Sequence, residues 1–258
     1  MKHISYSELK IWAECPFKHK LIYIDKLRKF QGNEYTAFGR SLHSLCEGML
    51  EGSLGEEDYN DFFEGMFGRE LGQLGNPEDL REKLVEDMLE QAKKITPHIL
   101  PEVANYFGEY EVFSIEEKLF EKISDFLLDK YTFKGYIDLV LKTSDGKYHI
   151  IDWKTCSWGW DARKRTDRLV TYQLTLYKKF FCQKHGIDPS LVETHFALLK
   201  RTAKKGNVEI FRVTSGNKKT ENANALLHKA LHNICKNNKI KNRLSCNGCE
   251  YYKTKQCP

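Results

Sequence analysis

The stretch that decides the fold is "YIDLVLKTSDGKYHIIDWKT", residues 136–155, in which two apolar runs flank a Ser-Asp-Gly turn. Both runs are typical of buried β-strands. Each nevertheless contains an aspartate, Asp138 or Asp152, and Lys154 follows the second one. Buried charges cost free energy unless they are paired, hydrogen-bonded or bound to a metal ion. The stretch therefore predicts a β-hairpin that carries either a structural ion pair or a functional site.

The length of the turn decides whether the two aspartates meet. Side chains alternate across a strand, and directly paired residues of a hairpin share one face. A two-residue Asp-Gly turn would place the aspartates on opposite faces. A three-residue turn over 144–146, ending in a left-handed glycine, sets Asp138 opposite Asp152, with Lys154 on the same face. We predict the three-residue turn.

Two carboxylates and a lysine on one face suit a particular chemistry. Carboxylate oxygens are hard ligands of the kind that Mg²⁺ and Mn²⁺ prefer. A neighbouring lysine can orient or help to activate a water molecule. Together with a bound metal ion, these groups can hydrolyse a phosphodiester bond. A structural ion pair between Lys154 and one aspartate is the alternative at this point.

The composition fits a globular protein that could meet nucleic acid. The chain has 258 residues, 41% hydrophobic and 30% charged, with a net charge of +5. That length allows one large domain or two small ones. The basic balance permits a nucleic-acid partner without establishing one. No apolar run approaches the roughly 18 residues of a membrane span, and the start "MKHISYSELK" has no apolar signal region, so we expect no membrane association and a cytoplasmic location.

The order of the expected elements gives the fold class. A helical start broken at Pro16 precedes the rest of the chain. After it we expect a helix at 36–50, an all-helical stretch at 52–108, a strand at 111–120, the hairpin strands 132–142 and 147–153, a helix at 166–186, strands at 193–200 and 207–213, and a basic helix at 218–238. The order α-β-β-β-α-β predicts a mixed α/β fold, with a central mixed sheet flanked by helices. We expect a single domain, 1–258, with 52–108 as a helical insertion.

The hairpin resembles the signature of the PD-(D/E)XK nuclease superfamily. That signature is an aspartate, a variable gap, and then Asp or Glu, any residue, and Lys. Here it is Asp138 followed by Asp152-Trp153-Lys154, with Ile137 in the place of the expected proline. The resemblance implies a restriction-endonuclease-like αβββαβ core and metal-dependent cleavage of nucleic acid.

Three further segments are similar to the RecB-like branch, which includes AddB-type and CRISPR-adaptation nucleases. They are "GRSLH" (39–43), "YQLTLY" (172–177), and the opening "SYSELKIWAECPFKHKLIYI" (5–24). The resemblance implies that His43, Asp138, Asp152 and the carbonyl of Trp153 hold Mg²⁺ or Mn²⁺. It assigns catalysis to Asp138, Asp152 and Lys154, with Gln173 and Tyr177 bracing the site or contacting the strand. From the residues alone, a lone histidine is more often structural, and Gln173 and Tyr177 fit an ordinary amphipathic helix.

Three cysteines near the C-terminus indicate a soft-metal site. Cys246 and Cys249 form a C-x-x-C pair, and Cys257 follows, which alone would suggest zinc with one ligand missing. In iron–sulfur members of the branch one cysteine precedes the core and three follow it, and Cys15 holds the first place. The resemblance thus implies a [4Fe–4S] cluster that clamps both ends of the chain, with zinc or free thiols as alternatives. The other cysteines are interpreted as structural: Cys46, Cys156, Cys182 and Cys235.

Two further groups of residues are weaker candidates. Alternation turns one of Glu116 and Glu117 toward the metal; we expect Glu117, with a solvated strand end as the alternative. The stretch "SWGWDARKR" (157–165) mixes aromatic rings with cations, a pattern that can stack on bases and meet phosphates. Its candidate DNA contacts are Trp158, Trp160, Arg163, Lys164 and Arg165. The alternative is a solvated basic loop with one buried tryptophan.

The sequence therefore predicts a Mg²⁺- or Mn²⁺-dependent deoxyribonuclease. We expect an exonuclease or end-processing enzyme that acts on single-stranded DNA or DNA ends, in recombination, DNA repair or CRISPR-type processing. Protein partners in such a complex are expected too. The alternative is a non-catalytic DNA-binding or scaffold subunit of a larger DNA-processing complex. No G-x-x-x-x-G-K-[ST] motif occurs, which excludes a P-loop motor within this sequence.

Overall fold

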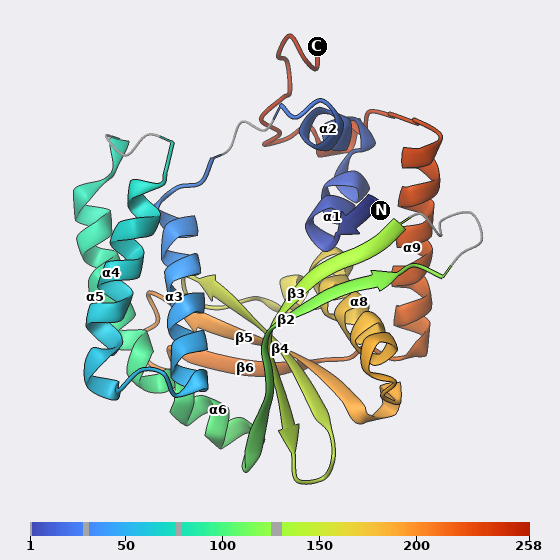
Figure 1. Ribbon diagram of the computed structural model, residues 1–258. Coiled ribbons are helices and arrows are strands. Elements are labelled where there is room, and N and C mark those ends of the chain that lie inside the picture. The colour runs from blue at the N-terminus through green and yellow to red at the C-terminus, as the bar shows by residue number, and fades with distance from the viewer. Residues whose placement is uncertain (1, 28–30, 76–78, 125–130) are drawn as a thin grey trace.

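A six-stranded mixed sheet forms the centre of the protein (Figure 1). The computed structural model describes residues 2–27, 31–75, 79–124 and 131–258. The strands are β1 (Lys2–Ser5), β2 (Tyr110–Lys122), β3 (Tyr131–Thr143), β4 (Tyr148–Cys156), β5 (Val192–Lys200) and β6 (Val208–Val213). Their order is β1-β3-β4-β5-β6, and β2 pairs with β3. The predicted mixed sheet flanked by helices is confirmed.

The sheet combines parallel and antiparallel pairs. β3 runs antiparallel to β2 and β4, and β6 runs antiparallel to β5. The pairs β1–β3 and β4–β5 are parallel. A parallel pair needs a crossover, and the helix predicted at 166–186 lies in the one that joins β4 to β5. The short parallel strand β1 was not expected from the sequence.

Helices cover both faces of the sheet and give it two hydrophobic cores. One core lies under α1 (Tyr6–Glu14), α8 (Arg168–His185) and α9 (Asn217–Cys235). The other lies under α3 (Glu34–Glu51), α4 (Tyr59–Gly72), α5 (Glu82–Ile95) and α6 (Ile99–Phe107). Figure 1 shows these two sets of helices on opposite sides of the sheet. Side chains that alternate across β4 supply both cores, because Ile150 belongs to the first and Ile151 to the second.

Local signals in the sequence explain where the early helices begin and end. The Ser5 side chain accepts a hydrogen bond from the Glu8 N–H at the start of α1. Helix α2 (Pro16–His19) begins at the proline and continues into a π-helix, Lys20–Ile24. Asn33 forms a capping box at the start of α3, and left-handed Gly52 ends that helix.

The β3–β4 hairpin has the predicted three-residue turn. The Thr143 N–H donates to the Lys147 carbonyl at 3.0 Å, and Gly146 has a φ of 79°. The pairing continues to Leu139 opposite Ile151 and stops there. In the same register the next pair would be Asp138 and Asp152. The regular ladder therefore ends where the acidic residues begin.

The remaining segments surround the sheet. The short helix α7 (Ala162–Thr166) precedes α8. Short 3-10 turns lie at Glu56–Asp58, Thr96–His98, Pro189–Leu191 and Arg243–Ser245. Beyond α9 the chain has little regular structure and lies beside α1 and α2 (Figure 1). Among the described residues, no helix combines the length and the apolar character that crossing a bilayer requires.

Candidate active site

Asp138 lies where the hairpin strands separate. Its Oδ2 accepts a hydrogen bond from the Trp153 N–H at 2.7 Å. A side chain thus takes a backbone donor that would otherwise face the neighbouring strand, and the ladder ends beside it. The Trp153 side chain is buried in the core under α3 to α6. The backbone N–H of Trp153 on β4 thus fixes the orientation of the Asp138 side chain on β3.

Asp152 is more deeply buried, with 1% of its surface exposed. Its Oδ1 accepts a hydrogen bond from Gln173 Nε2 on α8 at 2.8 Å. Its Oδ2 lies 2.5 Å from Lys154 Nζ, as an ion pair. Apart from this ion pair, Oδ2 has no hydrogen-bond partner among the residues that the structure describes. The ammonium of Lys154 is therefore the cation that satisfies this buried oxygen.

His43 reaches the site from α3. Its Nδ1 lies 3.6 Å from Asp138 Oδ2. Gly39, one helical turn earlier, lets α3 approach β4, because a Cβ there would lie 3.2 Å from Thr155 Oγ1. Burial, and then the charge of Lys154, lower the pKa of His43 to about 4. The imidazole is therefore neutral at neutral pH, the form that binds metal ions.

The electrostatics of the cluster favour an added cation. Burial, and then the charge of Asp152, raise the pKa of Asp138 well above its ordinary value. Burial opposes the charged form of Lys154, yet the carboxylates of Asp152 and Asp138 outweigh it and raise its pKa. One ammonium thus faces two carboxylates, and proton uptake by Asp138 is favoured when no other cation is present.

Gln173 and Tyr177 lie on one face of α8, behind Asp152. Gln173 Nε2 lies 3.2 Å from the Tyr177 hydroxyl, to which it donates a hydrogen bond. Tyr177 is buried, and its ring presses on β3 at Gly135, where a Cβ would lie 2.8 Å from the ring. Burial raises the pKa of the Tyr177 hydroxyl. Both side chains are thus placed to brace Asp152, and the burial of Tyr177 keeps it from contacting a DNA strand.

Two glutamates at the site were not assigned correctly from the sequence. Glu117, the predicted inward residue, is paired with Lys184 at 2.6 Å and His185 at 2.8 Å, so that expectation is wrong. Glu116 takes its place beside the site. Its φ of 48° is uncommon for a residue other than glycine, and it breaks the alternation on which the prediction depended. Such backbone distortion often marks functional positions.

Glu47 is the second glutamate, one turn after His43 on α3. Burial, and then the charge of Glu116, raise the pKa of Glu47 to about 7. Burial also raises the pKa of Glu116. The spacing of Glu47 four residues after His43 is the signal that could have identified it.

These side chains border a cavity of about 1210 Å³. Its lining includes His43, Glu47, Glu116, Lys154 and Arg40. The donor atoms of His43, Asp138 and Asp152 do not all lie within 4.8 Å of one another, since the described residues contain one such group and it lies elsewhere. Asp138 Oδ2 binds Trp153, and Asp152 binds Gln173 and Lys154. Metal binding would therefore require at least one carboxylate to turn.

The raised pKa values predict how stability depends on pH. An acid whose pKa is raised by folding stabilises the folded state below its unfolded pKa, and this contribution is lost as the pH rises through the folded pKa. Glu47 should therefore lower the melting temperature of metal-free protein as the pH rises from about 5 to about 8. Glu47→Gln should flatten this decline. Scanning calorimetry with a chelator present measures it, and identical pH profiles for the two proteins would contradict the assignment.

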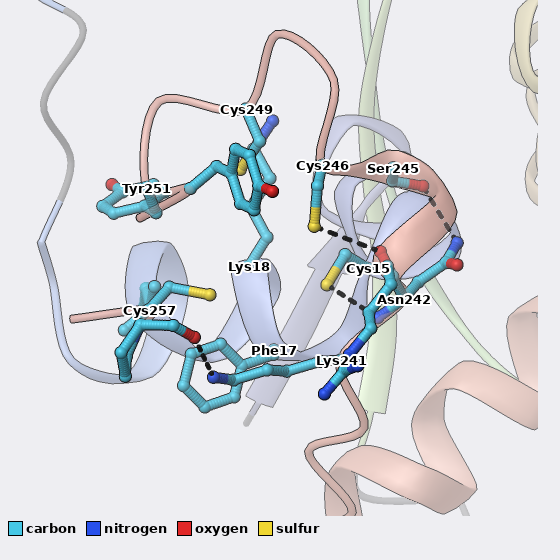
Figure 2. A pocket seen from close by; sticks show the side chains of 14 residues that line it. Cys15, Phe17, Lys18, Lys241, Asn242, Ser245, Cys246, Cys249, Tyr251 and Cys257 are labelled. Carbon is cyan, nitrogen blue, oxygen red and sulfur yellow. Dashed lines mark hydrogen bonds between the residues drawn. The ribbon is translucent and has the colours of Figure 1, made fainter. Parts of the chain in front are cut away.

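A second site gathers the four predicted cysteines from both ends of the chain. Cys15, Cys246, Cys249 and Cys257 border a cavity of about 240 Å³, and Figure 2 shows their side chains around one space. The Asn242 N–H donates to Cys15 Sγ at 3.4 Å, and the Asn242 side chain donates to the Glu14 carbonyl at 2.8 Å. The tail is thus attached to the end of α1 beside Cys15.

The sulfur atoms are not yet placed as the ligands of a single small ion. In the described part of the chain, no three of these thiols lie within 4.8 Å of one another. A tetrahedral zinc ion with Zn–S bonds of about 2.3 Å holds its sulfur ligands about 3.8 Å apart. Tyr251, Leu21 and Ile22 form a small core beside the thiols. Of the other cysteines, Cys46 and Cys182 are buried and Cys235 is exposed.

The basic stretch 157–165 divides into buried and exposed side chains. Trp160 is buried against Phe196 and Phe211, so the predicted stacking of this ring on a base is wrong. Arg165 is occupied by Glu209 at 2.5 Å and by the Trp160 carbonyl at 2.8 Å.

The other three members remain accessible. Lys164 is exposed and lies over the Trp160 ring, 4.5 Å from its centre. Trp158 is 76% exposed, and Arg163 is exposed as well. These three side chains stay candidates for DNA contact.

Comparison with solved structures supports the fold. A crystal structure described as "Putative exonuclease" from Eubacterium rectale covers 100% of this chain and 90% of that chain, with 15% identity and a TM-score of 0.58. This likeness supports the fold alone. A structure of SSO0001 covers 97% of this chain and 84% of that one, with 12% identity and a TM-score of 0.42. No curated protein matches the chain.

The comparison with protein families is decisive. The family model described as "PD-(D/E)XK nuclease superfamily" matches residues 3–257, which is nearly the whole chain. The match includes both aspartates and the lysine of the hairpin. The chain belongs to the PD-(D/E)XK nuclease superfamily.

Proposed function

We propose that the protein is a Mg²⁺- or Mn²⁺-dependent deoxyribonuclease of the RecB-like branch, which removes nucleotides from single-stranded DNA or DNA ends. The observation that carries the proposal is the cluster of Asp138, Asp152 and Lys154, in which one ammonium faces two carboxylates. Burial, and then the charge of Asp152, raise the pKa of Asp138 well above its ordinary value, so a further cation beside the pair would be stabilised.

The donor set fits a hard divalent cation. His43 Nδ1 and the carboxylates of Asp138 and Asp152 would hold it, with the Trp153 carbonyl as a fourth donor. Carboxylate and carbonyl oxygens suit Mg²⁺ and Mn²⁺, and a neutral imidazole completes the set. When bound, such an ion neutralises charge that gathers on the phosphate and lowers the pKa of water near it. Glu47 and Glu116 add negative charge on the cavity side.

Other side chains of the site orient the water, stabilise charge and hold Asp152 in place. Lys154 Nζ orients the attacking water and stabilises charge that develops on the phosphate oxygens. Gln173 fixes the orientation of Asp152 through Oδ1, and Tyr177 holds Gln173. Because both braces belong to a rigid helix, they keep Asp152 in one rotamer. Trp158, Arg163 and Lys164 are exposed and could contact the strand.

The exonuclease assignment follows from the branch and from the neighbour's description. The Eubacterium rectale structure is described as a "Putative exonuclease", and the segments around His43, Gln173 and Cys15 resemble the RecB-like branch. We infer a role in recombination, DNA repair or CRISPR-type processing, together with protein partners there.

We further propose that Cys15, Cys246, Cys249 and Cys257 hold a [4Fe–4S] cluster. Thiolates are the ligands of iron–sulfur clusters, and these four cysteines border one cavity at the place where the RecB-like resemblance implies a cluster. A bound cluster would hold the tail against α1 and α2. A zinc ion bound by the same cysteines is the alternative, and metal analysis distinguishes it from the cluster.

End-labelled single strands test the main proposal. Strands labelled at the 5′ or the 3′ end, with Mg²⁺, Mn²⁺ or chelator, should be shortened from one end only when the metal is present. Internal cuts without successive shortening would show an endonuclease instead. A lack of cleavage with every DNA, although the protein binds it, would favour a scaffold subunit.

Lys154→Met tests the role of the lysine. The change removes the ammonium and keeps the length of the side chain, so the rate of cleavage should fall by about 10²- to 10³-fold. Mn²⁺ binding should persist, because the carboxylates remain. Lys205→Met, at an exposed lysine, is the control and should cleave normally. Near-normal cleavage by the Lys154 variant would show that the lysine serves only as a structural ion pair.

A further inference from the structure

A second group of potential metal ligands lies on the other face of the sheet. His149 on β4 pairs directly with Glu193 on β5, and Ile151 pairs with His195 two residues further on. One donor atom from each of His149, Glu193 and His195 lies within 4.8 Å of the other two. The His149 ring faces Phe107 of α6, whereas Asp152 faces Gln173 of α8. The group is therefore separate from the candidate active site.

The two imidazoles are spaced as ligands of one ion. His149 Nδ1 lies 3.2 Å from His195 Nε2. Two nitrogens bound at about 2.0–2.1 Å to a tetrahedral ion lie about 3.3 Å apart. A hydrogen bond between the rings would also explain the distance. In either arrangement His195 Nδ1 is buried without a hydrogen-bond partner in the described part of the chain.

The hairpin turn fixes the orientation of His149. Thr143 Oγ1 donates to Asp145 Oδ1 at 2.5 Å and lies 3.0 Å from His149 Nε2. With its own proton directed to Asp145, the hydroxyl accepts the Nε2 proton of His149. The unprotonated Nδ1 then faces His195 and Glu193. A hydrogen-bonded outer partner of this kind orients most metal-binding histidines.

The surroundings keep the histidines ready to bind. Burial lowers the pKa of His195 to about 3, and burial also lowers the pKa of His149. Both imidazoles are therefore neutral at neutral pH. Glu193 Oε1 is paired with Arg212 at 3.2 Å and with Lys147 at 4.0 Å, so two cations compete for this carboxylate. All three candidate ligands border a cavity of about 430 Å³ that a solvated ion can enter.

We propose that His149, Glu193 and His195 form a zinc site that joins β4 to β5. Two imidazoles and one carboxylate are a ligand set of zinc, and Mg²⁺ prefers all-oxygen sites. The cavity leaves the fourth position to water. This inference goes beyond the proposed nuclease function and does not depend on it. In this account the ion ties neighbouring strands on the face away from Asp152.

Zinc binding by the full chain, with its cysteine site loaded, tests the proposal. Asp152→Asn serves as the background, because it removes a ligand of the candidate active site. Equilibrium dialysis with elemental analysis should find one zinc per chain, with the iron content unchanged. Adding His149→Gln or Glu193→Gln should weaken zinc binding at least tenfold, and Thr143→Val should weaken it about tenfold. His98→Ala, at an exposed histidine, is the matched control and should bind zinc normally.

Cobalt distinguishes this site from the cysteines. Co²⁺ bound by nitrogen and oxygen should give visible bands without the ultraviolet charge-transfer bands of thiolate ligands. These visible bands should disappear in His149→Gln. The proposal is overturned if the background protein binds no zinc at micromolar concentration. It is equally overturned if His149→Gln and Glu193→Gln both bind zinc as the background does, or if bound cobalt shows thiolate bands that only Cys15→Ser removes.

Discussion

Asp152→Asn should abolish cleavage of end-labelled single strands, with a fall in rate of at least about 10³-fold. The amide keeps the shape of the side chain and can still bond Gln173, but it removes the charge that pairs with Lys154. A metal ion then loses a carboxylate ligand, and the lysine loses its anchor. Single-turnover assays with Mg²⁺ and with Mn²⁺ measure the loss.

The fold should survive this substitution. The carboxylate is buried beside Asp138, and its negative charge raises the pKa of that neighbour. Removing the charge relieves this repulsion, so the melting temperature of the metal-free protein should fall little or rise. Asp87→Asn, at an exposed position of α5, is the matched control and should cleave normally. A folded Asp152→Asn variant that retains more than a tenth of the activity would place the chemistry elsewhere.

Cys15→Ser should lose iron and markedly lower the melting temperature. The tail holds its place by few contacts, chiefly those of Asn242, Ser245 and Tyr251 with the start of the chain. By analogy with a disulfide, closing a loop of roughly 240 residues is worth about 5 kcal/mol. For a chain of this size that corresponds to roughly 10–20 °C in melting temperature. Iron and sulfide analysis of protein purified without oxygen, with calorimetry, measures both effects.

Cys235→Ser provides the control for this variant. Cys235 is an exposed cysteine at the end of α9, outside the cavity of the four thiols. The substitution should leave the iron content and the melting temperature unchanged. Equal iron in both variants would remove Cys15 from the ligand set. If metal analysis of the unmodified protein finds zinc and no iron, the four cysteines hold a single zinc ion and not a cluster.

The hairpin shows what the sequence can predict. Local rules sufficed there: apolar alternation marked both strands, and the glycine at 146 selected the three-residue turn. That turn alone determines that Asp138 and Asp152 meet. The break at Pro16, the long helix of His43 and the crossover helix of Gln173 likewise follow from local patterns.

The errors have two physical causes, a local distortion of the backbone and contacts between distant residues. The choice between Glu116 and Glu117 assumed regular alternation, which the left-handed φ of Glu116 breaks. Trp160 is buried because β5 and β6 bring Phe196 and Phe211 beneath it. The short strand β1 forms only by pairing with a strand about 130 residues away.

The position of a bound Mn²⁺ ion tests the central claim most directly. Crystals of the protein with Mn²⁺ and a short single strand should give an anomalous peak between Asp138, Asp152 and His43, within about 2.5 Å of a carboxylate oxygen of each aspartate. A phosphate of the strand should lie beside the peak, with Lys154 in contact. A strand seated elsewhere, or Mn²⁺ found only at His149 and His195 while the aspartates keep their bonds to Trp153 and Lys154, would contradict the account.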